Sequence, residues 1–423
     1  MLNFSCSIIL LVLECTNGFR LYMQRGMILM PRSIWLLVIG MTINVTGSSF
    51  LWPLNTIYMH NHLGKSLSIA GIVLMLNSLA SVIGNLAGGV LFDKIGGFRS
   101  IIVGTTITLA SLVGLTFFHG WPEYIVLLIV LGFGSGLIFP AMYAMAGAVW
   151  PEGGRRGFNA LYVAQNLGVA VGSALGGFIA AISFDYIFIA NTAMFVVFFF
   201  IAFFAYRKMA DKTISNPTIL SEEAPVKNTK SWRAMVAICT VYILCWVGYV
   251  QWQSTISSYT QDIGISLSQY SMLWTVNGAL IVLAQPFIGV VVRKFLTSIK
   301  AQIIVGIAIF IVSYGIASTA ENFHGYLAAM VILTAGEMLV WPAVPTIANH
   351  LAPKGKAGFY QGMANSAATG GRMIGPVIGG FLVDQYGMGV LYAFLIGFLI
   401  VSIVITAIYD RSLSQETKEQ LVA

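Results

Sequence analysis

Long apolar runs without charged residues constrain this chain more than any other feature of its sequence. Ten such stretches, from Ile34–Met59 to Gln385–Tyr409, contain no Asp, Glu, Lys or Arg, and Asn322–Ala352 and Ala357–Val383 contain one charged residue each. A helix of roughly 20 residues crosses a bilayer with all its backbone amides paired, which hydrocarbon requires. We therefore predict an all-α membrane protein with twelve transmembrane helices.

Composition supports this prediction. Hydrophobic residues make up 58% of the chain and charged residues 9%, and the mean hydropathy is +0.86. Soluble domains carry about 25% charged residues, so a water-soluble globular protein is excluded. The net charge of +7 could suit nucleic acid, but in a membrane protein the placement of the charge matters more. We expect the lipid bilayer, and no nucleic acid, as a partner.

The basic residues alternate between the predicted loops. They follow spans 2, 4, 6, 8 and 10, whereas the other five loops carry only Lys65. Arg372 lies inside a span, and every remaining Lys and Arg falls on the first side. The positive-inside rule makes that side cytoplasmic. We predict a multi-pass protein of the bacterial plasma (inner) membrane with both termini in the cytoplasm.

One long polar stretch, residues 207–233, separates six spans from six and is typical of a linker. The apolar run near the N-terminus is too short to cross a bilayer. It is either an amphipathic anchor or an extension upstream of a start at Met27 or Met30. The predicted division is an N-terminal extension (1–30), an N-terminal six-helix bundle (31–206), a cytoplasmic linker (207–233), a C-terminal six-helix bundle (234–409) and a cytoplasmic tail (410–423).

The second half of the chain repeats the first. Trp52 corresponds to Trp252, Asn77 to Asn277 and Gly89 to Gly289, and after a few inserted residues the match continues between 172–177 and 375–380. A colinear series of matches indicates a duplication, hence two pseudo-symmetric bundles. Transporters are commonly built from such repeats, with the substrate site at the repeat interface near the midplane.

The segment between predicted spans 2 and 3 carries a family resemblance. Gly89-Val-Leu-Phe-Asp93-Lys94-Ile-Gly96-Gly-Phe-Arg99 resembles the loop motif G-x-x-x-D-[RK]-x-G-[RK]-[RK]-x of the major facilitator superfamily. The resemblance covers Pro31 to about Tyr409 and is closest to the twelve-span drug:proton antiporter group of bacteria. It implies the major facilitator fold and transport by alternating access.

The same resemblance implies a conformational latch made of Gly89, Asp93, Lys94, Gly96 and Arg99. Asp93, if placed at the start of predicted span 11, would meet the positive end of a helix dipole, and Arg99 could pair with it. Gly97 and Phe98 replace the usual basic pair of the family. In the repeat copy Arg293 stands where Asp93 does.

Two rows of small residues resemble the antiporter motif G-x-x-x-G-P-x-x-G-G of the family. They are Gly168, Gly172, Gly176 and Gly177 in span 5, and Gly371, Gly375, Pro376, Gly379 and Gly380 in span 11. This spacing lets helices pack backbone against backbone, and close packing alone explains each glycine equally well. Ser173 replaces the usual span 5 proline, and Leu128 stands where the family often has an Arg, so the motif weakens the expectation of antiport.

Glu337 and Arg372 are the ionisable residues near the centres of predicted spans. At about 1.5 Å per residue both lie about 20 Å from a helix end, at comparable depth. Charged side chains there are costly and mark functional sites. A contact between them that forms and breaks could bind and release the coupling proton, with a structural helix–helix pair as the alternative. Arg372 either holds that pair or contacts an anionic group of the substrate.

Aromatic and amide side chains provide the broad apolar faces and few polar groups of a small-molecule site. The predicted cavity residues are Trp52, Asn55, Tyr143, Gln165, Asn166, Tyr249, Trp252, Gln253, Trp274, Asn277 and Trp341. We expect about half of them to line the cavity, because a Trp in a membrane protein often faces lipid instead.

The leading prediction for function is a secondary transporter that couples proton entry to efflux of small amphipathic compounds, a multidrug-type antiporter. Proton-linked uptake of a small metabolite is the alternative, and a non-transporting membrane sensor is a remote one. No Walker loop, H-E-x-x-H motif or cysteine–histidine ligand spacing is present, so we expect no enzyme, metal or cofactor. The expected partners are the substrate and protons, and the expected oligomeric state is a monomer.

Overall fold

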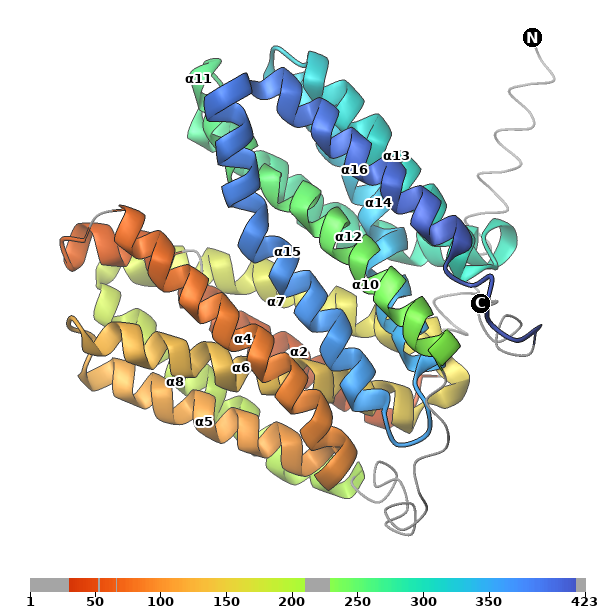
Figure 1. The fold of residues 1–423 in the computed structure, drawn as a ribbon. Helices are drawn as coiled ribbons and strands as arrows, with labels where there is room; N and C mark the ends of the chain where they lie inside the picture. The colour runs from red at the N-terminus through yellow and green to blue at the C-terminus, as the bar shows by residue number, and fades with distance from the viewer. Residues whose placement is uncertain (1–29, 52–53, 66, 210–228, 416–423) are drawn as a thin grey trace, which may run out of the picture.

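The computed structural model describes residues 30–51, 54–65, 67–209 and 229–415 (Figure 1). Its long elements are all helices, which confirms the all-α fold. The helices of 18 residues or more in this part of the chain are α2 (Arg32–Leu51), α4 (Leu67–Ile95), α5 (Gly97–Phe117), α6 (Glu123–Val149), α7 (Arg155–Ile182), α8 (Phe184–Ile201), α10 (Thr229–Tyr249), α12 (Leu267–Phe295), α13 (Ile299–Thr319), α14 (Phe323–Leu351), α15 (Ala357–Tyr386) and α16 (Met388–Ile408).

Hydropathy separates two of these helices from the rest. Within the described ranges nine helices are long and apolar enough to cross a membrane, or ten if the bent α12 counts as one span. α7 and α15 fall short because they carry the glycine rows and several polar residues, yet their 28 and 30 residues exceed the roughly 20 that a bilayer needs. The twelve long helices are compatible with the twelve predicted spans.

Helix ends depart from the predicted spans in three places. α10 begins at Thr229, inside the predicted linker, since Lys230 and Arg233 can extend toward the headgroups while the backbone stays helical. The predicted seventh span is interrupted: a 3₁₀ turn, η7 (Val250–Trp252), separates α10 from α11 (Thr255–Asp262). The first span is likewise followed by the short α3 (Asn55–Ile57) and η2 (Tyr58–His62). Residues 1–29 of the predicted extension, 210–228 of the predicted linker and 416–423 of the predicted tail lie outside the described residues.

The described helices form two bundles (Figure 1). Buried hydrophobic side chains of residues 34–209 make one core, and those of residues 234–413, joined by Tyr162, make the other. We call residues 30–209 the N-terminal half and residues 229–415 the C-terminal half. They meet where α4 packs on α15 and where α7 packs on α12 and α14.

Hydrogen bonds between the halves concentrate toward one end of the molecule. We call this the latch end; there α4 finishes and α15 begins. The bonds join Asp93 to Gly358 and Phe359, Ser366 to Val82, Asn85 to Thr369, Arg155 to Met338 and Leu339, Gln285 to Asn159, and Tyr162 to Glu337. All these residues lie between the helix midpoints and the latch end, which the distribution of basic residues predicts to be cytoplasmic. The halves are therefore closed against each other on that side.

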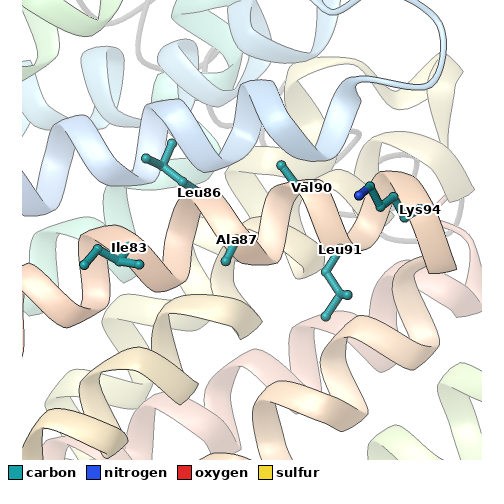
Figure 2. Close-up of a pocket in the computed structure, with 6 residues that line it drawn as sticks. All are labelled: Ile83, Leu86, Ala87, Val90, Leu91 and Lys94. Carbon is teal, nitrogen blue, oxygen red and sulfur yellow. The ribbon is translucent and has the colours of Figure 1, made fainter.

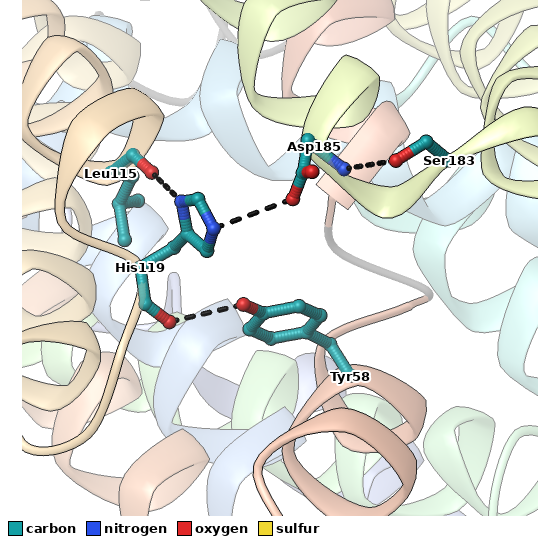
Figure 3. Close-up of polar contacts among 5 residues, drawn as sticks. All are labelled: Tyr58, Leu115, His119, Ser183 and Asp185. Carbon is teal, nitrogen blue, oxygen red and sulfur yellow. Dashed lines mark hydrogen bonds and ion pairs between the residues drawn. The ribbon is translucent and has the colours of Figure 1, made fainter.

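A separate polar cluster ties helices together at the opposite end of the N-terminal half (Figure 3). His119 Nε2 lies 3.3 Å from Asp185 Oδ1, linking the loop after α5 to the start of α8. The Tyr58 hydroxyl donates to the His119 carbonyl at 3.0 Å, and the Asp185 amide donates to Ser183 Oγ at 3.2 Å. These contacts stay within one half.

Candidate functional site

Glu337 lies at the midpoint of α14, and its side chain is 1% exposed. Its Oε1 accepts hydrogen bonds from Asn277 Nδ2 at 3.1 Å and from the Tyr162 hydroxyl at 3.2 Å, whereas Oε2 receives none from the described residues. Asn277 also donates to Thr334 Oγ1 at 2.9 Å. Three helices, α7, α12 and α14, thus converge on one carboxyl group.

Tyr162 is the member of this group that sequence reasoning missed. It comes from the N-terminal half, whereas Glu337 and Asn277 come from the C-terminal half. Its spacing offered a signal, because Gln165 and Asn166 follow it by three and four residues and share its helix face. The Tyr162–Glu337 bond connects the carboxyl group directly to the relative position of the two halves.

Aromatic rings surround the carboxyl group on the side of the C-terminal half. Trp341 follows Glu337 by one helical turn and stacks on Trp246, with ring centroids 4.7 Å apart and an interplanar angle of 5°. Tyr242 and Tyr249 pack edge-on against Trp341 at 5.4 and 5.5 Å. Trp274 reaches Tyr249 at 6.1 Å. Trp246 and Tyr242 were not predicted, although they precede Tyr249 by one and two turns.

The remaining predicted cavity residues divide into two sets. Tyr143 donates to Gln165 at 3.3 Å, and Asn166 Nδ2 donates to the Tyr162 carbonyl at 2.9 Å, so these three lie on or against the stretch of α7 that carries Tyr162, the partner of Glu337. The structure does not bring the others there: Asn55 accepts from Tyr124, Trp252 is fully buried against Tyr326, and Gln253 is exposed after η7. Trp52 lies outside the described residues.

Arg372 does not pair with Glu337. Its guanidinium lies 4.8 Å from the centre of the Trp246 ring and donates to Thr369 Oγ1 at 3.3 Å. Among the described residues the ion pairs are His119–Asp185 and Lys300–Asp410, and neither involves these two side chains. The two residues approach the aromatic group from different helices, so equal depth did not make them partners.

Asp93 caps the start of α15. Its Oδ1 accepts from the Gly358 amide at 2.8 Å and its Oδ2 from the Phe359 amide at 2.9 Å. Amides in the first turn of a helix lack intrahelical acceptors, and the helix dipole favours an anion there. This is the contact that the loop motif implies, made between the two halves.

The other motif residues differ in what they touch. A Cβ on Gly89 would lie 2.2 Å from the Gly358 carbonyl oxygen, so only glycine allows this approach. Gly96, with φ of +82°, lets the chain turn between α4 and α5. Lys94 and Arg99 are exposed, and Arg99 makes no ion pair with Asp93.

The glycine rows pack against the first helix of their own half. Added Cβ atoms at Gly168, Gly172 and Gly176 would meet α2 backbone atoms, the closest being the Thr46 carbonyl oxygen at 2.4 Å from Gly172. In the second row Gly371, Gly375 and Gly379 face α10, η7 and the start of α11, whereas Gly380 has nothing within 4 Å. Pro376 lies inside α15, and Gly177 lies in α7.

Arg155, at the start of α7, makes a cross-half contact that the sequence did not suggest. Its Nη2 donates to the Met338 carbonyl at 2.9 Å and the Leu339 carbonyl at 3.4 Å. Pro342 has no N–H, so the Met338 carbonyl lacks its usual partner four residues later in α14. The proline supplies the acceptor that Arg155 uses.

A shallow apolar depression lies on α4, and none of the predicted cavity residues lines it (Figure 2). One helix supplies all of its lining, which is Ile83, Leu86, Ala87, Val90, Leu91 and Lys94. Ile83 and Val90 are 53% and 36% exposed on the outer surface. Apolar side chains facing outward on a spanning helix suit lipid contact, so this depression is not the predicted cavity.

The fold agrees with comparisons to known proteins. A family model described as the Major Facilitator Superfamily matches residues 37–376 and, in a second match, 255–421. The uncharacterized MFS-type transporter YttB of Bacillus subtilis is 62% identical over 393 residues, covering 92% of this chain and 99% of YttB. The quinolone resistance protein NorA of Staphylococcus aureus is 21% identical, covering 92% of this chain and 100% of NorA.

Solved structures show the same architecture. The human organic anion transporter MFSD10 (TETRAN) superposes with a TM-score of 0.71 at 13% identity, covering 89% of this chain and 100% of that one. A bacterial homologue of the iron transporter ferroportin in an outward-facing state gives a TM-score of 0.70 at 13% identity, covering 89% of this chain and 99% of that one. Such identities speak for the fold alone. The family match and the closely similar relative confirm the resemblance read from the sequence: this chain belongs to the Major Facilitator Superfamily and is a membrane transporter rather than an enzyme.

Proposed function

We propose that this transporter couples proton entry to the export of small amphipathic compounds, with Glu337 as the proton carrier. The observation that carries the proposal is the hydrogen bond from Tyr162 to Glu337, because it joins the only described carboxyl group at the centre of a helix to the contact between the halves. Relatives at 21–22% identity include NorA and the multidrug resistance protein MdtH of Aeromonas hydrophila, whose names favour export.

Alternating access would change the surroundings of Glu337 in two ways. With the latch end closed, the carboxyl group is withdrawn from water, which favours its protonated form. Opening at the latch end separates α7 from α14, removes Tyr162 and admits water from that side. The carboxyl group can then release its proton into the cytoplasm. Proton movement inward thus accompanies the return of the substrate-free transporter to the state open at the latch end, and the opposite change of state, with Glu337 deprotonated and the substrate bound, exports the substrate.

The aromatic group offers a matching substrate surface. Trp341, Trp246, Tyr249 and Tyr242 combine flat apolar rings with neighbouring polar groups, the composition of a pocket for small amphipathic molecules, and Trp246 is the partly exposed member of the group in this state. One chain supplies both halves and the whole group, so the proposed working unit is a monomer. The distribution of basic residues supports a plasma-membrane orientation with the latch end and both termini in the cytoplasm.

The test compares Glu337→Gln with Glu321→Gln, which changes an exposed carboxylate just before α14. Proteoliposomes with an imposed pH gradient report driven transport of a fluorescent amphipathic dye. Dye exchange without a gradient reports substrate binding and the conformational change between the two halves. We expect Glu337→Gln to abolish driven transport and retain exchange, since the amide has the same size but cannot titrate. Glu321→Gln should retain both. Full driven transport by Glu337→Gln would overturn the proposal.

A second variant addresses the arginine. Arg372→Gln, alone and combined with Glu337→Gln, separates a structural pair from a proton carrier. If the two residues stabilise each other in another state, the double variant should recover protein abundance lost in the single variants. Because proton carriage depends on Glu337 alone, the double variant should still lack gradient-driven transport. The sign of the pH change inside vesicles on substrate addition distinguishes export from proton-linked uptake.

A further inference from the structure

Arg372 is a cation on an inward-directed helix face with no carboxylate partner among the described residues. It follows Asn365 by two helical turns and Gln361 by three, so the three share one face of α15. Gln361 Nε2 donates to the Pro345 carbonyl of α14, which shows that this face looks into the C-terminal half. The opposite face carries Ile374, Val377 and Phe381, which are 39%, 69% and 60% exposed.

Arg372 is nevertheless exposed, whereas Gln361 on the same face is fully buried. Exposure on an inward-directed face beyond the closed latch end places the guanidinium in solvent-accessible space between the helices. One of its nitrogens contacts Thr369 Oγ1, and its plane lies against Trp246. The remaining N–H groups of the guanidinium therefore stay available, in the planar fork that matches a carboxylate.

The rings beside Arg372 define the rest of the ligand. Trp246 is partly exposed and contacts the guanidinium, and it stacks face-to-face on Trp341, which is buried one turn after Glu337, so Trp246 is the ring that borders the accessible space beside the cation. A planar ring packed against the exposed part of Trp246 would bring an attached carboxylate to the free edge of Arg372.

We propose that Arg372 and Trp246, with Trp341 packed behind Trp246, form a subsite for aromatic carboxylates, so that the exported compounds include planar organic anions or zwitterions. This inference rests on the proposed export function and names its substrate class. Arg372 then acts as an anion-binding residue, and Glu337, which faces Tyr162 and Asn277, carries the proton separately.

The experiment measures equilibrium binding of 2-naphthoate to the purified full-length protein in lipid nanodiscs, without a pH gradient, by equilibrium dialysis. The neutral 2-naphthamide tests the charge, and decanoate tests the ring. We expect 2-naphthoate to bind about tenfold more tightly than either, as loss of a hydrogen-bonded charge or a stacked ring predicts. Equal binding of naphthoate and naphthamide, or no saturable binding of naphthoate, would overturn the subsite.

Variants assign the effect to residues. Arg372→Gln should remove the preference for naphthoate over naphthamide, and Arg372→Lys should keep part of it, since a point charge attracts the anion without the fork. Trp246→Leu should weaken naphthoate binding and leave decanoate binding unchanged. Arg411→Gln, at an exposed position after α16, is the matched control. Unchanged discrimination in Arg372→Gln would contradict the proposal.

The proton-carrying role is tested independently of this site. Glu337→Gln should bind 2-naphthoate normally in the absence of a gradient while losing driven transport. Failure of naphthoate binding in the wild-type protein with intact pH-driven dye transport would reject the subsite and leave export standing. Normal naphthoate binding together with full pH-driven transport by Glu337→Gln would reject Glu337 as the proton carrier and leave the subsite standing.

Discussion

Two of the contacts that close the latch end use opposite chemistry, although both take their charged side chain from the N-terminal half. At the α4–α15 contact a carboxylate from the N-terminal half, Asp93, accepts from amides at the start of α15. At the α7–α14 contact a guanidinium from the same half, Arg155, donates to carbonyls in the middle of α14. One contact exploits the unpaired donors of a helix end, and the other an unpaired acceptor left by Pro342.

The difference teaches how a duplicated fold loses its symmetry. The position equivalent to Asp93 holds Arg293, so the second copy cannot place a carboxylate at a helix start. Basic residues also begin α7, and one of them turns toward α14 instead. The N-terminal half thus supplies the charged side chain of both contacts, and the two contacts can be broken separately.

The largest effect on transport is expected where the backbones of α4 and α15 lie in contact next to Asp93. Gly358→Ala would place a Cβ 2.3 Å from the Gly89 carbonyl oxygen, so the α4–α15 contact must open. We expect transport to fall more than tenfold, as overpacking by roughly 1–3 kcal/mol predicts. Gly370→Ala, on the same helix with nothing within 4 Å, should transport normally. A spin-label distance between Cys substitutions at the exposed Glu152 and Lys354 should lengthen in Gly358→Ala and stay unchanged in Gly370→Ala.

Asp93→Asn should have the next largest effect. The amide keeps the size of the side chain but loses the attraction of a carboxylate to the helix dipole, worth roughly 0.3–2 kcal/mol. We expect about a fivefold loss of transport and a longer spin-label distance. Lys94→Gln, its exposed neighbour, should change transport little. Equal, mild losses of transport in the two variants would show that Asp93 does not act as a conformational latch.

Arg155→Gln should open the other contact with a smaller loss of transport, about threefold, because a glutamine amide can still donate a neutral hydrogen bond, worth roughly 0.5–1.5 kcal/mol, in place of the charged one. Arg156→Gln, at the exposed neighbouring position, is the control. Pro342→Ala gives the Met338 carbonyl an intrahelical donor. In that background Arg155→Gln should have less effect; an undiminished effect would show that Arg155 acts through another group.

The smallest effect is expected at the far end of the N-terminal half. His119→Gln removes a partly exposed ion pair with Asp185, whose contribution to the free energy of unfolding is at most about 1 kcal/mol. Thermal unfolding should shift slightly downward, and the spin-label distance at the latch end should stay unchanged. A changed distance would mean that closure of the latch end also depends on contacts within one half, and not only on the contacts between the halves.

Much of the fold and part of the site followed from the sequence by itself. Apolar length determined the helices, because hydrocarbon leaves a spanning backbone no other way to pair its amides. The loop motif located Asp93, since a carboxylate and a helix start attract each other wherever the chain brings them together. Burial of Glu337 could be anticipated from its position in an apolar helix.

Tertiary structure decided the partners. Glu337 and Arg372 lie at similar depth, yet depth does not fix the direction in which a helix face points. The packing of α7, α12 and α14 places Glu337 against Tyr162 and Asn277. Arg372 instead contacts Trp246, because Gly371 and Gly375 draw α15 against α10. Trp252 entered a core since η7 turns it away from the interface. Whether a helix can lie in lipid depends on its own residues, so this property can be predicted from the sequence. Which side chains pair depends on how each helix is rotated about its axis, and only the packing of the helices determines that rotation.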